Sequence, residues 1–335
     1  MKLMKAIQIK AAGADFELVQ IEIPEPKEKE VLIKVEACGI CHGDAIAKDG
    51  HMPGIKYPII PGHEVVGIVD KVGSEVKTFK VGQRVGVGWH GGHCFQCEAC
   101  RKGNFGSCDH SLTTGLHVDG GYAEYMTARE EVIVNLPGEY KSEDIAPLLC
   151  AGRTTFGALK ESPAKPGDLV AIHGLGGLGH LAVQYAVKMG FKTVVLSRGK
   201  EKEKLAYKLG AHVYIDNQEV DGAKELMKLG GATVILCTAP NAKAISALIP
   251  GLGRNGQAII VTGTGDLIQF PAFMMLGGQR SVKGFVSGNI EEAINFSILT
   301  KVVPMIEVFP LEQAAVAFEK MMTAKVLFRS VLKMS

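Results

Sequence analysis

Strand-like and helix-like segments alternate along the chain between residues 150 and 286, and this alternation limits the fold more than any other feature. The apolar runs include "DLVAIHG", "KTVVLS", "ATVILCTA" and "GQAIIVTG". Between them lie segments of helical spacing, such as "LGHLAVQYAVKMG" and "KEKEKLAYKLG", which end in glycine. Strands and helices that alternate at this spacing form a doubly wound parallel sheet, so we predict an α/β domain over residues 150–286.

The turn after the first of these strands has the pattern GxGxxG. The pattern runs from Gly174 to Gly179, and we expect Gly174, Gly176, Gly177, Leu178 and Gly179 to line the site. The turn follows a predicted strand and opens a predicted helix, which is the context in which this pattern indicates a dinucleotide site. Glycines there permit a tight turn and let the backbone approach a pyrophosphate at the helix N-terminus. We therefore predict a Rossmann dinucleotide-binding domain; a glycine turn that binds nothing is the alternative.

The end of the second strand of this domain indicates which dinucleotide binds. An Asp or Glu at this point would bond the hydroxyls of the adenosine ribose. The chain instead has Ser197, Arg198, Gly199 and Lys200. Two cations and a small hydroxyl suit a 2′-phosphate better than a bare ribose, so we favour NADP(H) over NAD(H). In the alternative interpretation, Arg198 and Lys200 are only a solvated face.

The first 149 residues have a different hydropathy pattern. Short alternating apolar runs, such as "KAIQIK", "EVLIKVEA" and "EVVGIVDKVG", are separated by Gly, Pro and charged turns. They predict a strand-rich, barrel-like domain. A length of 335 residues also favours two domains. We place the boundaries at 1–149 and 150–286, and we expect the mixed tail, 287–335, to return to the first domain.

Four cysteines lie close together in "CFQCEACRKGNFGSC": Cys94, Cys97, Cys100 and Cys108. Four thiolates within so short a segment can close a tetrahedral shell around one Zn²⁺, with no open position. An iron–sulfur cluster also takes four thiolates. No proline follows the last cysteine and no second set exists, so we predict a structural zinc.

A second group of metal-ligating residue types is spread widely: Cys41, His63, Glu64 and Cys150. Two thiolates and an imidazole would leave a fourth zinc position for water, substrate or a carboxylate, as in catalytic zinc sites. Spacing alone does not join these residues. Cys41 could equally pair with Cys38 in a C-x-x-C redox motif.

The order of these motifs resembles that of the zinc-dependent medium-chain alcohol dehydrogenases, especially the yeast-type and cinnamyl-alcohol-type branches. The resemblance extends over essentially the whole chain and rests on "GHEVVG" at 62–67 followed by Gly73, the cysteine array, the glycine turn and "CAGRTTFGAL". It implies a GroES-like catalytic domain, to which the C-terminal segment returns, and a Rossmann domain. It also implies two zinc ions per chain.

The same resemblance implies roles for the residues of the spread group. Cys41, His63 and Cys150 would ligate the catalytic zinc, with Glu64 as a fourth ligand when water is absent. Asp44 would accept a hydrogen bond from His63 and fix its tautomer, although a simple turn cap is the alternative. Zinc would act as a Lewis acid on the substrate oxygen while hydride passes between substrate carbon and nicotinamide.

Three further residues would contact the cofactor. Thr154 would lie near the nicotinamide, His42 would contact the pyrophosphate, and Arg329 would reach the phosphates, unless Arg329 is only a surface charge. The chain departs from the family at Gly43, where a Ser or Thr usually begins a proton relay, and at Ile46, where a histidine is common. Our hypothesis is that protons leave by water or through His42 or His51.

Composition excludes several other function classes. The net charge of +2 gives no reason to expect a nucleic acid or a membrane surface as partner. No secretory signal is visible, so we expect a reducing, cytoplasmic compartment in which the eight cysteines form no disulfides.

The predicted function is hydride transfer between NADP(H) and a primary aliphatic, benzylic or allylic alcohol or its aldehyde.

Two alternatives stay open at this point. One is a polyol or formaldehyde-type dehydrogenase of the same superfamily. The other is a non-catalytic zinc and dinucleotide sensor that has lost turnover together with its proton relay. The resemblance also implies a homo-oligomer, a tetramer or a dimer, acting on a small-molecule substrate.

Overall fold

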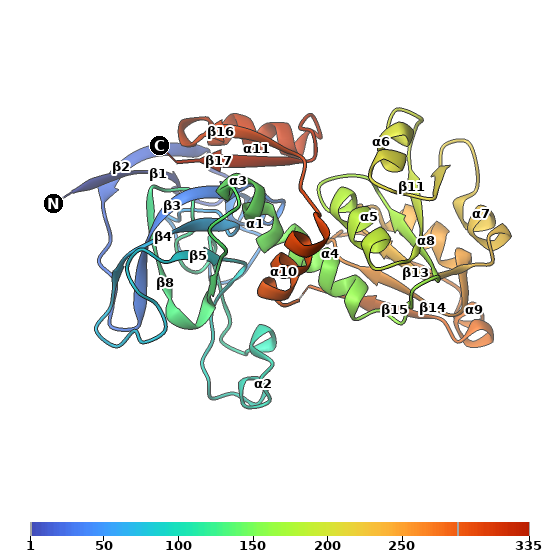
Figure 1. Cartoon of the computed structure of the whole chain (residues 1–335), viewed down its shortest axis with the longest axis horizontal. Coiled ribbons are helices and arrows are strands. Elements are labelled where there is room, and N and C mark those ends of the chain that lie inside the picture. The colour runs from blue at the N-terminus through green and yellow to red at the C-terminus, as the bar shows by residue number, and fades with distance from the viewer. Residues whose placement is uncertain (1, 287, 335) are drawn as a thin grey trace. The chain divides into compact units, whose positions relative to one another are not determined.

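The computed structural model describes residues 2–286 and 288–334. Its contacts divide the chain into two compact units (Figure 1). The first unit comprises residues 1–150 and 304–335, and the second comprises residues 151–303. Both ends of the chain therefore belong to the first unit.

The first unit is built on a seven-stranded sheet in which β17 (Arg329–Lys333) joins the C-terminal segment to the strands of the N-terminal half. The order is β16-β17-β3-β4-β5-β9, and β8 also pairs with β3. Its other strands are β16 (Ile306–Pro310), β3 (Glu30–Gly39), β4 (Val65–Val72), β5 (Arg84–Val87), β8 (Tyr125–Arg129) and β9 (Ile133–Asn135). Two small antiparallel pairs complete the strands: β1 (Leu3–Ile9) with β2 (Phe16–Glu22), and β6 (His90–Gly92) with β7 (Leu112–Thr113).

The core of this unit lies against β3, where Val31, Ile33 and Val35 alternate toward one side and are fully or almost fully buried. This spacing of two is what a strand with one face on a core requires. Its helices are short: α1 (Gly43–Asp49), α2 (Glu98–Arg101), α3 (Ser142–Ile145) and α11 (Ala314–Met322). The predicted strand-rich domain is confirmed.

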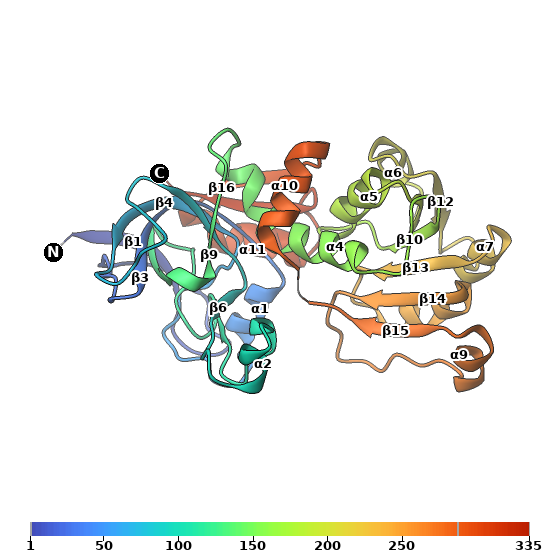
Figure 2. The ribbon, with the colours of Figure 1, turned by 60° about the horizontal axis from the view of Figure 1, so that its bottom comes forward.

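The second unit is a six-stranded, all-parallel sheet in the order β12-β11-β10-β13-β14-β15. This order, with the first strand at the centre and a reversal beside it, is typical of dinucleotide-binding folds. Figure 2 shows β13, β14 and β15 side by side. The strands are β10 (Leu169–His173), β11 (Lys192–Ser197), β12 (Val213–Asp216), β13 (Ala232–Cys237), β14 (Leu252–Ile260) and β15 (Ser281–Gly284). The prediction of a Rossmann-type parallel sheet is therefore confirmed.

Helices connect these strands and cover the sheet. Leu169 and Ala171 of β10 form one core cluster with Leu226 of α7 and Ile245 of α8. α5 contacts β10 and β11 and also packs against α4. The helices are α4 (Ala151–Lys160), α5 (Gly179–Lys188), α6 (Glu203–Lys208), α7 (Gly222–Lys228), α8 (Ala242–Leu248), α9 (Ala272–Gly278) and α10 (Ile290–Thr300).

The return of the chain to the first unit begins at Pro304, later than the predicted residue 287. The cause is α10, which packs on α4 and α5. Phe296 lies 5.1 Å from Phe156 between ring centroids, and the hydroxyls of Tyr185 and Ser297 are hydrogen-bonded at 2.7 Å. Residues 288–303 thus belong to the second unit, and residue 287 itself lies outside the described residues. Cys150 ends the first unit, so the predicted boundary at 149 and 150 differs by one residue.

In the described ranges, none of the helices has the length and apolar character that a membrane span needs.

Candidate active site

Cys41, His63, Glu64 and Cys150 come together in the first unit, although they lie far apart in the sequence. One ligand atom from each residue lies within 4.8 Å of the ligand atoms of the others. The sulfurs of Cys41 and Cys150 are 3.9 Å apart. The structure thus joins the four residues of the spread group, which spacing alone could not do.

The pairing of β3 with β4 explains how two of the segments meet. Cys38, near the end of β3, pairs with Val65, the first residue of β4. The strands are antiparallel, so the turn after β3, which carries Cys41, emerges beside the loop before β4, which carries His63. Cys150 follows a 3-10 helix over residues 146–149 that contacts both strands.

Asp44 is buried between these segments and contacts both of them. Its Oδ2 accepts a hydrogen bond of 2.8 Å from the backbone N–H of Cys41, and its Oδ1 lies 3.1 Å from Nδ1 of His63. A carboxylate at Nδ1 favours the tautomer that leaves Nε2 free to bind a metal. The geometry thus accommodates both the turn cap and the support of His63.

The electrostatics of the cluster favour a cation. Burial lowers the pKa of His63, but the carboxylate of Asp44 and the thiol of Cys41 outweigh it and raise that pKa to about 10. A hydrogen bond from Cys150 holds the pKa of Cys41 well below its usual range, against the effect of burial and together with His63. These groups gather negative charge around the imidazole and attract positive charge to it.

The donor set also fits zinc in its chemistry and spacing. Two sulfurs, each about 2.3 Å from a tetrahedral ion, lie about 3.8 Å apart, close to the 3.9 Å between Cys41 and Cys150. Nε2 of His63 is buried and accepts or donates no hydrogen bond among the described residues. A buried nitrogen of this kind is costly unless another group, such as a metal, engages it.

Glu64 pairs with Arg329, and both side chains are buried. Nη2 of Arg329 donates to Oε1 of Glu64. Burial raises the pKa of Glu64 to about 7, although the guanidinium opposes this effect. Arg329 is 2% exposed, so the alternative that it is a surface charge is wrong. Its predicted contact with cofactor phosphates stays a prediction.

The cysteine array forms a second cluster, around α2. The four ligand atoms of Cys94, Cys97, Cys100 and Cys108 lie within 4.8 Å of one another. Sγ of Cys94 is 4.0 Å from that of Cys100 and 3.5 Å from that of Cys108. Backbone N–H groups of Cys100 and Asp109 lower the pKa of Cys97 to about 6. These sulfurs meet the spacing that a four-thiolate metal site requires, although burial raises the pKa of Cys100 to about 12.

Gly43 and Trp89 form one wall of the site, a pairing that the sequence did not predict. A Cβ at Gly43 would lie 2.6 Å from Cζ3 of Trp89 and 2.8 Å from Cε1 of His63. Trp89 meets the imidazole edge-on, with ring centroids 4.7 Å apart. Trp89 and Ile46 both pack on a small apolar cluster. The wall therefore has apolar groups at the positions where the family carries its proton relay.

The glycine turn of the second unit needs glycine at two of its positions. Gly174 has a φ of +96°, which favours glycine, and its N–H donates to the carbonyl of Leu196. A Cβ at Gly179 would lie 2.0 Å from the carbonyl oxygen of Gly174, whereas one at Gly176 would meet no atom within 4 Å. α5 begins at Gly179, directly after Gly177 and Leu178, so its N-terminus is at the turn.

The segment after β11 lies next to this turn. Ser197 is buried, and Arg198 and Lys200 are exposed. Nζ of Lys202, which sequence reasoning missed, donates to the carbonyl of Leu175 in the turn at 3.1 Å. The signal for Lys202 was present, because it continues the row of cations after the strand.

His42 and Thr154 lie at helices of different units. His42 is exposed at the start of α1, and Thr154 is buried in α4. His51 is exposed just after α1. The predicted roles of all three stay predictions.

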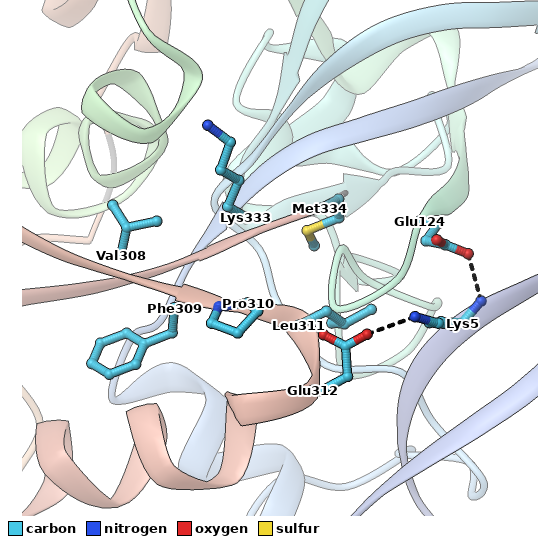
Figure 3. Close-up of a pocket in the computed structure, with 9 residues that line it drawn as sticks. All are labelled: Lys5, Glu124, Val308, Phe309, Pro310, Leu311, Glu312, Lys333 and Met334. Atoms are coloured by element: carbon cyan, nitrogen blue, oxygen red, sulfur yellow. Dashed lines mark hydrogen bonds and ion pairs between the residues drawn. The ribbon is translucent and has the colours of Figure 1, made fainter.

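A separate pocket of about 370 Å³ lies against β16 and β17 (Figure 3). Phe309 and Met334 line it, and the Nζ of Lys5 forms an ion pair of 2.7 Å with Glu312 beside them. The backbone N–H of Lys5 also donates to Glu124 at 2.7 Å. Its lining includes none of the candidate metal ligands, and these charges already have partners, so we assign it no role.

Comparison with known proteins agrees with the fold and places the chain in a family. Two family models match the chain: the alcohol dehydrogenase GroES-like domain over residues 27–138, and the zinc-binding dehydrogenase over residues 177–300. Alcohol dehydrogenase patD of Penicillium expansum is 44% identical, with 98% of this chain and 97% of that protein covered. An alcohol dehydrogenase of Geobacillus stearothermophilus is 40% identical, with 99% of each covered.

Solved structures give the same result. A cinnamyl alcohol dehydrogenase of Sorghum bicolor has a TM-score of 0.87 at 29% identity, covering 99% of this chain and 98% of that chain. CAD from Helicobacter pylori, solved in complex with NADP(H), has a TM-score of 0.85 at 28% identity with the same coverage.

A GroES-like unit, a parallel dinucleotide-binding sheet and a thiol–imidazole cluster define a zinc-binding oxidoreductase of the dehydrogenase class. The chain belongs to the zinc-dependent medium-chain alcohol dehydrogenase family.

Proposed function

We propose that this chain transfers hydride between NADP(H) and a primary aliphatic, benzylic or allylic alcohol or its aldehyde. The observation that carries the proposal is the convergence of Cys41, His63, Glu64 and Cys150, whose ligand atoms lie within 4.8 Å of one another. Zinc bound there supplies Lewis-acid polarisation of the substrate oxygen. The hydride chemistry itself belongs to the nicotinamide.

The chain's own residues hold and shape this site. Asp44 keeps the proton of His63 on Nδ1, so that Nε2 faces the metal. Glu64 would be a fourth ligand when water is absent, and its pair with Arg329 holds its other oxygen. Trp89 presents an apolar ring beside His63, which suits a substrate with a hydrocarbon substituent at its reacting carbon.

We also propose NADP(H) as the preferred cofactor. The second strand ends in the buried Ser197 and not in an acid, and Arg198 and Lys200 follow it in exposed positions. The relative from Helicobacter pylori was solved with NADP(H). One carboxylate lies in the same loop: a Cβ at Gly199 would be 2.2 Å from Oε2 of Glu201.

This preference is tested by steady-state rates with NADPH and NADH in matched variants. We expect Arg198→Ala to raise the KM for NADPH about tenfold and to leave that for NADH unchanged, because only the 2′-phosphate distinguishes them. Glu201→Gln is the matched control and should change neither the KM for NADPH nor the KM for NADH by more than about twofold. A wild-type preference for NADH would refute the assignment.

The cysteine array would hold a second, structural zinc, giving two ions per chain. Four thiolates leave that ion no open position for a substrate, so its role is to fold the α2 segment. Because thiolates must stay reduced to bind zinc, this proposal also favours a reducing, cytoplasmic compartment.

We propose in addition that the protein is a homo-oligomer, either a dimer or a tetramer. β15 pairs with β14 in the described part of the chain and presents its other edge without a strand partner. Nearby α9 exposes Phe273 at 84% and Leu276 at 76%. An open strand edge next to exposed apolar side chains favours association with another copy. Light scattering of wild type and Phe273→Asp tests this, and an unchanged mass would refute the role of α9.

The proposed reaction is tested with a panel of aliphatic, benzylic and allylic aldehydes, formaldehyde and a polyol, alongside zinc stoichiometry. Aldehyde reduction above background excludes a purely sensing protein. We expect two zinc ions per chain. Turnover confined to the polyol or formaldehyde would refute the proposed substrate class.

A further inference from the structure

Tyr122 reaches the candidate metal site through Asp44. Its side chain is 0% exposed, and its hydroxyl donates a hydrogen bond of 2.8 Å to Oδ2 of Asp44. That same oxygen accepts the N–H of Cys41 at 2.8 Å, while Oδ1 lies 3.1 Å from Nδ1 of His63. Both donors act on one carboxylate oxygen, so together they fix the rotation of the carboxylate and direct its other oxygen to the imidazole.

We propose that Tyr122 is a positioning residue of the metal centre, which acts through Asp44 to hold the ring of His63 with Nε2 facing the ion. The inference rests on the proposed function, because it requires a metal at Cys41, His63 and Cys150. The hydrogen bond is charge-assisted, since the acceptor is a carboxylate, and bonds of this kind are about twice as strong as neutral ones.

The backbone around Tyr122 ties it to the loop that carries His63. Three N–H groups in a row donate to three carbonyls in a row across the two segments. The pairs are Gly120 with Ile60 at 2.7 Å, Gly121 with Gly62 at 3.0 Å, and Tyr122 with Pro61 at 3.0 Å. The tyrosine backbone therefore moves with the loop at 60–62, directly before His63.

The ring of Tyr122 then crosses that loop at Gly62. A Cβ at Gly62 would lie 2.3 Å from Cδ1 of Tyr122, and the φ of +100° at Gly62 favours glycine as well. This close approach places the hydroxyl at the turn that carries Cys41 and Asp44. Tyr122 thus links the two segments that bring the first two metal ligands.

The variant Tyr122→Phe removes one oxygen and keeps the ring that packs on Gly62. It leaves Oδ2 of Asp44 with a single donor, so that the carboxylate can rotate away from His63. Loss of an outer partner of a metal ligand typically costs about 10–100-fold in metal affinity. Tyr122 acts one bond further out, and we expect release of the catalytic zinc to become about tenfold faster.

The experiment follows release of zinc from the loaded full-length protein to a chromophoric chelator. The zinc of the cysteine array is an internal reference, since nothing in the proposal connects it to Tyr122. Tyr185→Phe is the matched control, because Tyr185 is also 0% exposed and its hydroxyl makes one hydrogen bond, to Ser297 in the second unit. In Tyr122→Phe we expect one zinc equivalent to be released faster and the other at the wild-type rate. In Tyr185→Phe we expect both to be released at the wild-type rates.

Two further measurements separate positioning from general destabilisation. With cobalt in place of zinc, the visible absorption bands of the catalytic site should shift in Tyr122→Phe and not in Tyr185→Phe. In an Asp44→Asn background, the effect of Tyr122→Phe on release should fall below about twofold, because the residue acts through that carboxylate.

The proposal is overturned if both equivalents leave faster together, if release and the cobalt spectrum match wild type, or if the effect persists in Asp44→Asn. A wild-type protein that holds only the array zinc would instead refute the proposed catalytic site itself, and the inference would fall with it.

Discussion

A side chain at position 43 has no room while Trp89 stays in place, and this conflict can be tested quantitatively. A Cβ there would lie 2.6 Å from Cζ3 of Trp89 and 2.8 Å from Cε1 of His63. Carbon atoms in good contact are about 3.5–4.0 Å apart, so one of the rings must move by about 1 Å. His63 is 1% exposed and held by Asp44, whereas Trp89 is only partly buried. Trp89 is therefore the ring that yields.

Two opposing effects set the size of the penalty for Gly43→Ala. Gly43 is the first residue of α1, and replacing a glycine in a helix by alanine stabilises it by up to about 1 kcal/mol. An extra carbon in a packed site costs about 1–3 kcal/mol. We expect a net loss of about 1–2 kcal/mol in wild type. In Trp89→Leu the contact with Cζ3 is removed and the contact with His63 remains, so the same change should cost about 1 kcal/mol less, which is the expected coupling energy.

Urea unfolding of the four proteins of this double-mutant cycle, followed by circular dichroism, measures the coupling. Equal costs of Gly43→Ala in the two backgrounds would refute the reasoning, because Trp89 would then not be the neighbour that excludes a side chain.

The same conflict changes how the proton hypothesis should be tested. Gly43→Ser alone places its hydroxyl in a strained site, so it should lower alcohol oxidation. Gly43→Ser combined with Trp89→Leu removes the closer of the two contacts, and the pH profile of alcohol oxidation should then shift relative to Trp89→Leu alone. An unchanged profile in the double variant would show that a hydroxyl at position 43 takes no part in proton release in this chain.

Three other outcomes follow from the structure. Burial lowers the pKa of His173 to about 4, below its unfolded value of about 6.5, so the unfolded state binds the extra proton. The free energy of unfolding therefore falls as pH drops from about 6.5 to 4. Measured by urea unfolding over that range, it should fall by about 3 kcal/mol less in His173→Leu than in wild type. Arg329→Met should destabilise by about 3–5 kcal/mol because it leaves the buried Glu64 without its partner, and adding Glu64→Gln should recover most of this in the same assay. Cys97→Ser should remove one zinc equivalent, measured by elemental analysis, and lower the melting temperature, whereas retention of both equivalents would contradict a four-thiolate site.

The features that could be predicted from the sequence are those whose cause is local. The alternation of apolar runs and helical segments specifies a parallel sheet because each strand is buried on both faces. The cysteine array places four ligands within one short segment, so no tertiary information was needed to bring them together. The glycine turn is likewise defined by backbone conformation over a few residues.

The elements that escaped prediction depend on tertiary packing. α4, "AGRTTFGALK", contains two glycines and two threonines, which are poor helix formers, yet it is helical because nearly all of it is buried. α9, "AFMMLGG", lacks a periodic apolar face and ends in two glycines. The contacts of Tyr122 with Asp44 and of Arg329 with Glu64 join segments far apart in the chain, and no local pattern encodes them.

One candidate metal site is held by local contacts and the other by tertiary contacts, and this difference determines how each should respond to substitutions elsewhere in the chain. In the array, the sulfurs accept hydrogen bonds from backbone N–H groups of their own segment, such as that of Cys97 to Cys94. The other site depends on the register of β3 with β4, on Asp44, and on Arg329 from the last strand of the chain. Substitutions in β17 or in the segment at 120–122 should therefore disturb only the second site, because the geometry of the array is set within its own loop.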